Sequence, residues 1–137
     1  MDMQITLPGG KRVDAHYKGF DIKTDQPAAG GGEGSAPAPF DLFLASLGTC
    51  AGFYVLSFCQ ERNIPTDDIH LVMSTERDPQ KKMIGRVTIE INLPEEFPEK
   101  YLSAVRQAAG LCTVKKHIQN PPEFDIRTIH PSGGTGE

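Results

Sequence analysis

The side chains best suited to chemistry in this 137-residue sequence are three cysteines, Cys50, Cys59 and Cys112. If the segment around the first two is helical, Cys50 and Cys59 lie on opposite sides of the helix, about 13 Å apart along its axis. They cannot bridge each other, because a disulfide needs Cα atoms within about 7 Å. Cys112 is therefore the partner within the chain that Cys50 could reach. Each thiol could instead be a small buried hydrophobic residue, an interpretation that fits Cys59 best.

Composition restricts the environment and the partners. An odd number of cysteines without a C-x-x-C pair favours reduced thiols in a cytosol over a disulfide scaffold. The first ten residues have no secretory signal pattern, so we expect a cytoplasmic protein. The net charge of −4 argues against nucleic acid as a partner. The cysteines and histidines lack metal-ligand spacing, and we expect no metal and no cofactor.

One long apolar segment must position Cys50. Residues 39–59 read PFDLFLASLGTCAGFYVLSFC, without a charge from Leu42 to Cys59. Such a helix, apolar on every side, must be enclosed by protein or lipid. Its 18 uncharged residues only just reach the length of a membrane span. The segment also contains polar side chains and lies in the middle of the sequence, between strand-like segments, so a buried central helix is favoured. A second copy of this short chain would help to cover it.

The ends of this helix carry clear signals. Pro39 suits the first helical position, and Asp41 places a negative charge in the first turn. Residues 63–65, Asn-Ile-Pro, end the helix. The preceding residues 25–38 are rich in Gly, Pro and Ala and are expected to hold no regular structure. They could form a flexible linker, or a loop over a site or towards a partner chain.

The flanking segments alternate in the way that strands do. Residues 3–7 and 13–17 predict a β-hairpin, and the apolar phase then changes at Gly19, which indicates either a β-bulge or two strands with a kink. Antiparallel strands are predicted over 69–76 and 87–93. A helix is predicted over 94–110, with Leu102, Val105 and Ala109 on its buried side. A short helix from Cys112, a strand over 124–128 and a frayed tail from Pro131 are predicted after it. The order ββ-α-ββ-α-α-β predicts one α+β domain over residues 1–137.

Together these features resemble the OsmC/Ohr superfamily. The resemblance rests on a Gly-rich approach, the helical motif P-x-D-L-F-L-A-S-L-G-T-C, and C-x-V about sixty residues later. It covers nearly the whole chain. It implies an intertwined α+β homodimer with an antiparallel sheet, a long buried central helix and sites at the interface. It also implies a thiol-dependent peroxidase in which Cys50 is the peroxidatic cysteine and Cys112 the resolving one.

The family activates its first cysteine with an N-terminal arginine and a glutamate just before the helix. Phe40 stands where that glutamate is expected, and Asp41 beside it could replace it only after a shift. Arg12 is the one N-terminal arginine candidate. Because burial disfavours a thiolate, the pKa of Cys50 should rise unless a cation lies close by. We therefore include Arg12 and Asp41 among the expected site residues.

The resulting functional hypothesis is a homodimeric thiol peroxidase. A thiolate at Cys50 would attack a hydroperoxide, the resulting sulfenic acid would condense with Cys112, and an external dithiol would reduce the disulfide. The alternative is a non-enzymatic relative that binds a small apolar ligand, or senses oxidants through Cys50. Neither reading involves nucleic acid or a membrane.

Overall fold

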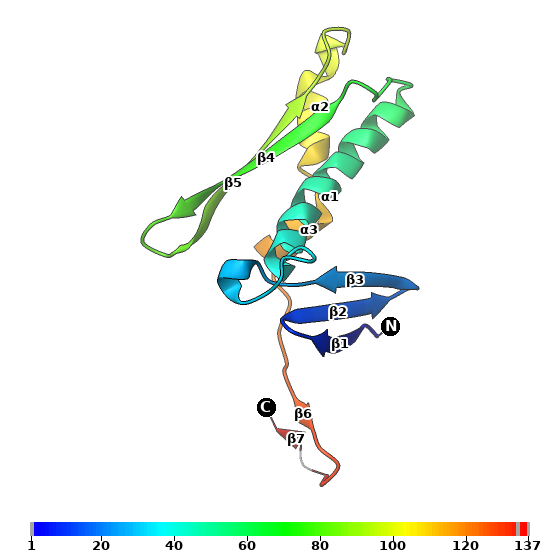
Figure 1. The fold of residues 1–137 in the computed structure, drawn as a ribbon. Helices are drawn as coiled ribbons and strands as arrows, with labels where there is room; N and C mark the ends of the chain where they lie inside the picture. The colour runs from blue at the N-terminus through cyan, green and yellow to red at the C-terminus, as the bar shows by residue number, and fades with distance from the viewer. Residues whose placement is uncertain (1, 134, 137) are drawn as a thin grey trace.

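The computed structural model describes residues 2–133 and 135–136 and shows an α+β fold (Figure 1). Helix α1 lies beside the β4–β5 hairpin, α2 and α3 pack against α1, and a three-stranded sheet lies near the start of α1 (Figure 1). In chain order the elements are β1 (Gln4–Gly9), β2 (Arg12–Tyr17), β3 (Phe20–Thr24), the 3-10 turn η1 (Ala28–Gly30), α1 (Pro39–Glu61), β4 (His70–Asp78), β5 (Met83–Asn92), η2 (Glu99–Tyr101), α2 (Leu102–Ala109), α3 (Thr113–Gln119), β6 (Thr128–Ile129) and β7 (Thr135–Gly136).

The first sheet is antiparallel in the order β1-β2-β3, which confirms the predicted N-terminal hairpin. The phase change after it is not a β-bulge: it separates two strands, β2 and β3, as the alternative interpretation predicted, but a tight turn and not a kink joins them. Lys18 and Gly19 have φ values of 53° and 81°, and Tyr17 pairs with Phe20 across them. Two consecutive residues with positive φ form the tight turn that fits the twist of a hairpin. The chain therefore reverses here and adds a third strand.

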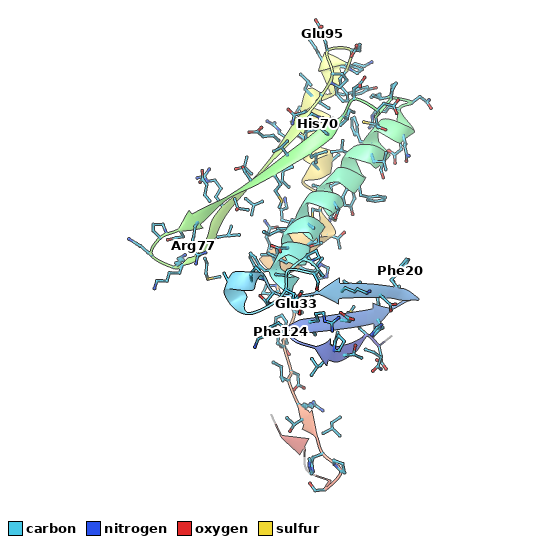
Figure 2. The ribbon with its side chains drawn as sticks, in the orientation of Figure 1. Phe20, Glu33, His70, Arg77, Glu95 and Phe124 are labelled. Atoms are coloured by element: carbon cyan, nitrogen blue, oxygen red, sulfur yellow. The ribbon has the colours of Figure 1, made fainter. Side chains whose placement is uncertain are left out.

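The Gly-rich segment 25–38 is an ordered loop wound around Asp25, so the flexible-linker interpretation is wrong. The Asp25 carboxylate is 1% exposed. It accepts hydrogen bonds from the Ser35 hydroxyl at 2.6 Å, the Ser35 amide at 3.0 Å and the Gln26 amide at 2.7 Å. These donors, the Ser35 hydroxyl first, lower the pKa of Asp25 to about 2, so the carboxylate is ionised at neutral pH. Figure 2 shows Glu33 of this loop beside the start of α1.

Helix α1 begins at Pro39 as predicted. The Asp41 carboxylate accepts a hydrogen bond from the Ala38 amide at 3.0 Å, which satisfies a free donor at the helix start. At the other end Asn63 has a φ of 54°. Asn adopts this left-handed conformation more readily than most residues, and a residue in that conformation after the last turn ends a helix.

Helix α1 is buried along one side only, so the prediction of an enclosed helix is not met within one chain. The residues buried on it are Leu47, Ala51, Val55, Phe58 and Cys59. The side chains of Phe40 and Phe53 are more than half exposed. Its length and composition would also suit a membrane span, and 28% of its most apolar stretch is buried. That α1 lies in a water-soluble protein stays a prediction.

The core lies where α1 meets α2. Val55, Phe58 and Cys59 of α1 pack there with Phe97 and with Val105 of α2. The β4–β5 hairpin covers this cluster and is antiparallel, as predicted. The helix predicted over 94–110 is shorter in the structure: α2 covers only Leu102–Ala109, and the turn η2 comes directly before it. Leu102, expected on the buried stripe, is 48% exposed because it opens α2 at the edge of the core.

The C-terminal segment differs from the prediction. No strand forms over residues 124–127, and only Thr128–Ile129 of β6 pairs, with β7. Phe124 and Ile126 are at least 80% exposed, since none of the strands formed by the described residues pairs with them. The described part of the tail is not frayed throughout, because β7 pairs with β6. Gly134 and Glu137 lie outside the described residues. The single predicted sheet is thus divided into separate antiparallel sheets.

Candidate active site

The structure brings Cys50 and Cys112 together from two helices. Cys50 lies in the middle of α1 and is half-buried, and Cys112 is the residue that caps the start of α3 and is 3% exposed. The Cys112 side chain is one of the hydrogen-bonding groups that lower the pKa of Cys50, so the two thiols are neighbours. Helices α1 and α3 pack against each other, which places the two thiols side by side although 62 positions separate them (112 − 50). Both cysteines are free thiols.

The Cys50 thiol has several hydrogen-bond donors around it. The Val114 amide is the strongest influence and lowers the pKa of Cys50 below its ordinary value. Burial opposes this effect, and the Cys112 thiol and the amide and hydroxyl of Thr113 add to the lowering. The sequence had suggested that the pKa rises unless a cation lies close by. The first turn of α3 supplies donors in place of that cation.

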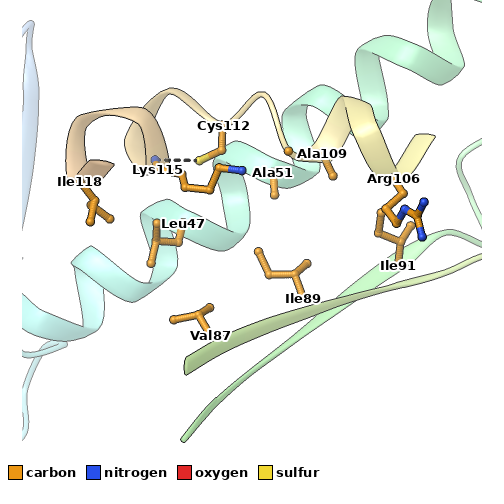
Figure 3. A pocket seen from close by; sticks show the side chains of 11 residues that line it. Leu47, Ala51, Val87, Ile89, Ile91, Arg106, Ala109, Cys112, Lys115 and Ile118 are labelled. Carbon is orange, nitrogen blue, oxygen red and sulfur yellow. Dashed lines mark hydrogen bonds between the residues drawn. The ribbon is translucent and has the colours of Figure 1, made fainter. Parts of the chain in front are cut away.

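Cys112 has a structural role at the same point. Its Sγ accepts a hydrogen bond from the Lys115 amide at 3.4 Å, shown as the dashed line in Figure 3. This contact replaces the usual hydroxyl or carboxylate cap, and α3 begins at the next residue. The prediction that a short helix opens at Cys112 is thereby confirmed. The cap holds the sulfur of Cys112 beside Cys50.

Sequence reasoning missed one contact in this site. The hydroxyl of Tyr54 on α1 lies 3.1 Å from the hydroxyl of Thr113 on α3. Tyr54 follows Cys50 by four positions, so both side chains lie on the same face of α1. That spacing was a usable signal for Tyr54. Nothing in the sequence indicated that Thr113 would meet it, because the pair depends on how α3 packs.

An apolar cavity of about 320 Å³ adjoins the Cys112 thiol, between α1, β5, α2 and α3 (Figure 3). Cys112 lies in its wall, whereas Cys50 is not among the described residues that line it. Two cationic side chains, Arg106 and Lys115, stand among the lining residues. The rest of the wall is hydrocarbon or backbone and consists of Leu47, Ala51, Val87, Ile89, Ile91, Ala109, Gly110 and Ile118. The cavity therefore suits an apolar group held next to a thiol.

Within this chain the other expected site residues do not join the thiols. Arg12 lies in β2, where its Nε donates to the Gly9 carbonyl at 3.3 Å. The Asp41 carboxylate caps α1, nine residues and about 13 Å along the axis from Cys50. A role for Arg12 or Asp41 towards Cys50 of a partner chain stays a prediction. Cys59 is fully buried in the core, where burial raises the pKa of its thiol despite nearby Arg62.

Comparison with known proteins decides the family. The family model for OsmC-like proteins matches residues 32–127, which include both Cys50 and Cys112. The chain belongs to the OsmC-like family. No curated protein sequence matches this OsmC-like chain.

Solved structures share the fold of this OsmC-like protein at low sequence identity. A protein from Psychrobacter arcticus 273-4, whose name refers to osmotic stress induction and a detoxification response, is 23% identical with a TM-score of 0.71, covering 94% of this chain and 88% of that one. The OsmC-like protein of Mycoplasma pneumoniae is 13% identical with a TM-score of 0.68 and coverages of 88% and 87%. The organic hydroperoxide resistance protein OhrB of Bacillus subtilis is 22% identical with a TM-score of 0.53 and coverages of 88% and 93%.

Proposed function

We propose that this OsmC-like protein is a thiol-dependent peroxidase that reduces organic hydroperoxides or hydrogen peroxide. Cys50 is the peroxidatic cysteine and Cys112 the resolving cysteine. The observation that carries the proposal is that Cys50 on α1 and Cys112 at the start of α3 are neighbours, where hydrogen bonding, that of the Val114 amide first, lowers the pKa of Cys50. A thiolate is the nucleophilic form of cysteine, so this environment prepares Cys50 for attack.

The reaction proceeds in three balanced steps. The Cys50 thiolate attacks the distal oxygen of ROOH, the O–O bond breaks, and the leaving alkoxide takes a proton to give ROH and a sulfenic acid. The Cys112 thiol then attacks the Cys50 sulfur, which forms the disulfide and releases water. An external dithiol reduces this disulfide by exchange and is itself oxidised to a disulfide.

The cavity favours an organic hydroperoxide over hydrogen peroxide as the substrate. Its wall is mainly hydrocarbon, and Cys112 in that wall is a neighbour of Cys50. Burial of apolar substrate surface contributes about 25 cal/mol per Å², a gain that hydrogen peroxide cannot have. The similar B. subtilis structure is named as an organic hydroperoxide resistance protein, which supports the same substrate class.

A turnover assay tests the proposed function. The protein is mixed with excess dithiol and with alkyl hydroperoxides of increasing chain length, and peroxide consumption is followed. A peroxidase consumes many equivalents per chain, faster for the longer alkyl groups. The second candidate function is an apolar-ligand binder or oxidant sensor, favoured by the apolar cavity and by the position of Arg12 away from Cys50. Consumption of one equivalent or none would select that candidate.

One equivalent of hydroperoxide without dithiol should link Cys50 to Cys112 within one chain and leave Cys59 free. The Cys50 and Cys112 side chains are neighbours, whereas Cys59 is fully buried in the core. Mass spectrometry of non-reduced digests identifies the linked peptides. Mixing isotopically labelled and unlabelled protein before oxidation separates links within a chain from links between chains. A main disulfide that contains Cys59 would contradict the proposed pair.

We further propose that the protein is a cytoplasmic homodimer. Apolar side chains on one side of α1, such as Phe43, Phe53 and Leu56, are more than a third exposed, and so is Phe20 at the turn end of β3 (Figure 2). Burial of such large apolar side chains contributes about 1.5–3 kcal/mol each, so a second copy would stabilise the fold. Sedimentation at low micromolar concentration should show no folded monomer. A stable monomer there would contradict a shared-interface arrangement.

A further inference from the structure

We propose that the hydroxyl groups of Thr113 and Tyr54 form a proton relay that serves Cys50. This proposal rests on the proposed peroxidase function, because it concerns the proton that the leaving alkoxide needs. In it Thr113 is a catalytic residue, since its hydroxyl contacts the reacting sulfur. Tyr54 is a positioning residue that acts through Thr113.

The geometry connects the three groups in a chain. Thr113 is the first residue of α3, which packs against α1, and its hydroxyl is one of the hydrogen-bonding groups that lower the pKa of Cys50. The Tyr54 hydroxyl lies 3.1 Å from the Thr113 hydroxyl. Tyr54 is only half-buried. The relay therefore links the half-buried sulfur to a phenol that can exchange protons with water.

The two hydroxyl groups can reverse direction when Cys50 ionises. Each hydroxyl has one proton to donate and can also accept. When Cys50 is a thiol, it can donate to Thr113, which then donates to Tyr54. When Cys50 is a thiolate it can only accept, so Thr113 must donate to the sulfur and Tyr54 must donate to Thr113. The relay thus stabilises the thiolate and keeps a proton next to it.

Peroxide reduction needs such a proton. When the Cys50 thiolate bonds to the distal oxygen, the O–O electron pair leaves on the alkoxide, which must be protonated. Thr113 passes its proton to the alkoxide while Tyr54 passes one to Thr113, and water restores Tyr54. The other hydrogen bonds to Cys50 come from the Val114 and Thr113 amides, which cannot release a proton, and from Cys112.

The charged and titratable groups around the relay come from three helices. Cys112 and Lys115 belong to the start of α3, and so does the backbone contact of His117, whose Nδ1 lies 2.7 Å from the Thr113 carbonyl oxygen. Arg106 lines the adjoining cavity from α2, and Tyr54 belongs to α1. None of the substitutions that test the relay changes a charge at neutral pH. A change in Cys50 reactivity can therefore be assigned to the hydroxyl groups.

The test compares Thr113→Val with Thr113→Ser and Tyr54→Phe in the full-length protein. The rate at which iodoacetamide alkylates Cys50 is followed by mass spectrometry between pH 5 and 10, without peroxide. Loss of one hydrogen bond to a thiolate should shift the alkylation profile by about one pH unit, which slows alkylation about tenfold at neutral pH. Thr113→Val should show this loss, Thr113→Ser should restore the wild-type profile, and Tyr54→Phe should slow alkylation about threefold.

The single-turnover oxidation of Cys50 by cumene hydroperoxide is then measured at a pH where Cys50 is ionised in every variant. Thr113→Val and Tyr54→Phe should still be slower than wild type there, because proton delivery is impaired. Equal rates for wild type and Thr113→Val in both measurements would overturn the relay, and so would failure of Thr113→Ser to restore them. If wild type does not react with the hydroperoxide at all while Cys50 is alkylated normally, the proposed peroxidase function has failed, and with it the relay's role in catalysis.

Discussion

Replacing Cys50 with serine should reduce hydroperoxide turnover to the rate measured without protein. A serine hydroxyl is a weak nucleophile unless a base activates it, and the groups around Cys50 are hydrogen-bond donors that stabilise an anion. Hydrogen-bond donors can shift the ionisation of a thiol towards neutral pH. The same donors cannot make a serine hydroxyl ionise at that pH. Peroxide consumption in the presence of excess dithiol measures the loss.

Two other cysteine variants complete this experiment. Cys112→Ser should consume about one equivalent of hydroperoxide rapidly and then slow down, because the sulfenic acid on Cys50 lacks its resolving thiol. Cys59→Ala is the matched control, since Cys59 is fully buried in the core, away from the site, and should leave turnover unchanged. Retained turnover in Cys50→Ser would assign the attack to another thiol. Loss of turnover in Cys59→Ala with an intact fold would show that the assignment of the three cysteines is wrong.

Replacing Gly32 with alanine should disrupt the loop that precedes α1. A Cβ atom at this position would lie 2.6 Å from the carbonyl carbon of Gln26 and 2.7 Å from a carboxylate oxygen of Asp25. Real Cβ atoms do not approach within 3.0 Å, so the backbone around Asp25 must move. Overpacking of this kind costs about 1–3 kcal/mol of unfolding free energy. Urea unfolding followed by circular dichroism, at one fixed chain concentration, measures the loss.

The control for this prediction lies two residues away in the same loop. A Cβ atom at Gly30 would meet its nearest neighbours at 3.5 Å or more, which is ordinary contact, and Gly30 has no positive φ. Gly30→Ala should therefore leave stability unchanged or raise it slightly, because alanine restricts the unfolded chain more than glycine does. Equal stability of the two variants would mean that the loop is not held closely around Asp25.

Local patterns in the sequence were sufficient for most of the secondary structure. Pro39 and Asp41 mark the start of α1 and Asn63 its end, because caps and turn conformations depend on neighbouring residues. Alternating apolar residues likewise identified the first hairpin and the β4–β5 pair. The loop around Asp25 was not predicted. Its carboxylate bonds reach Ser35, ten positions away, and a Gly-rich composition indicates only that no helix or strand forms.

The sequence by itself determined which cysteines could meet. Helix geometry separates Cys50 from Cys59, and the family motifs place Cys50 and Cys112 in the OsmC-like pattern. Only the tertiary structure decided which groups lower the pKa of Cys50. The Val114 amide is a backbone donor that every residue except proline possesses, so it leaves no signal in the sequence. Its effect on the Cys50 thiol arises because α3 begins against the middle of α1, and that arrangement depends on packing between segments far apart in the chain.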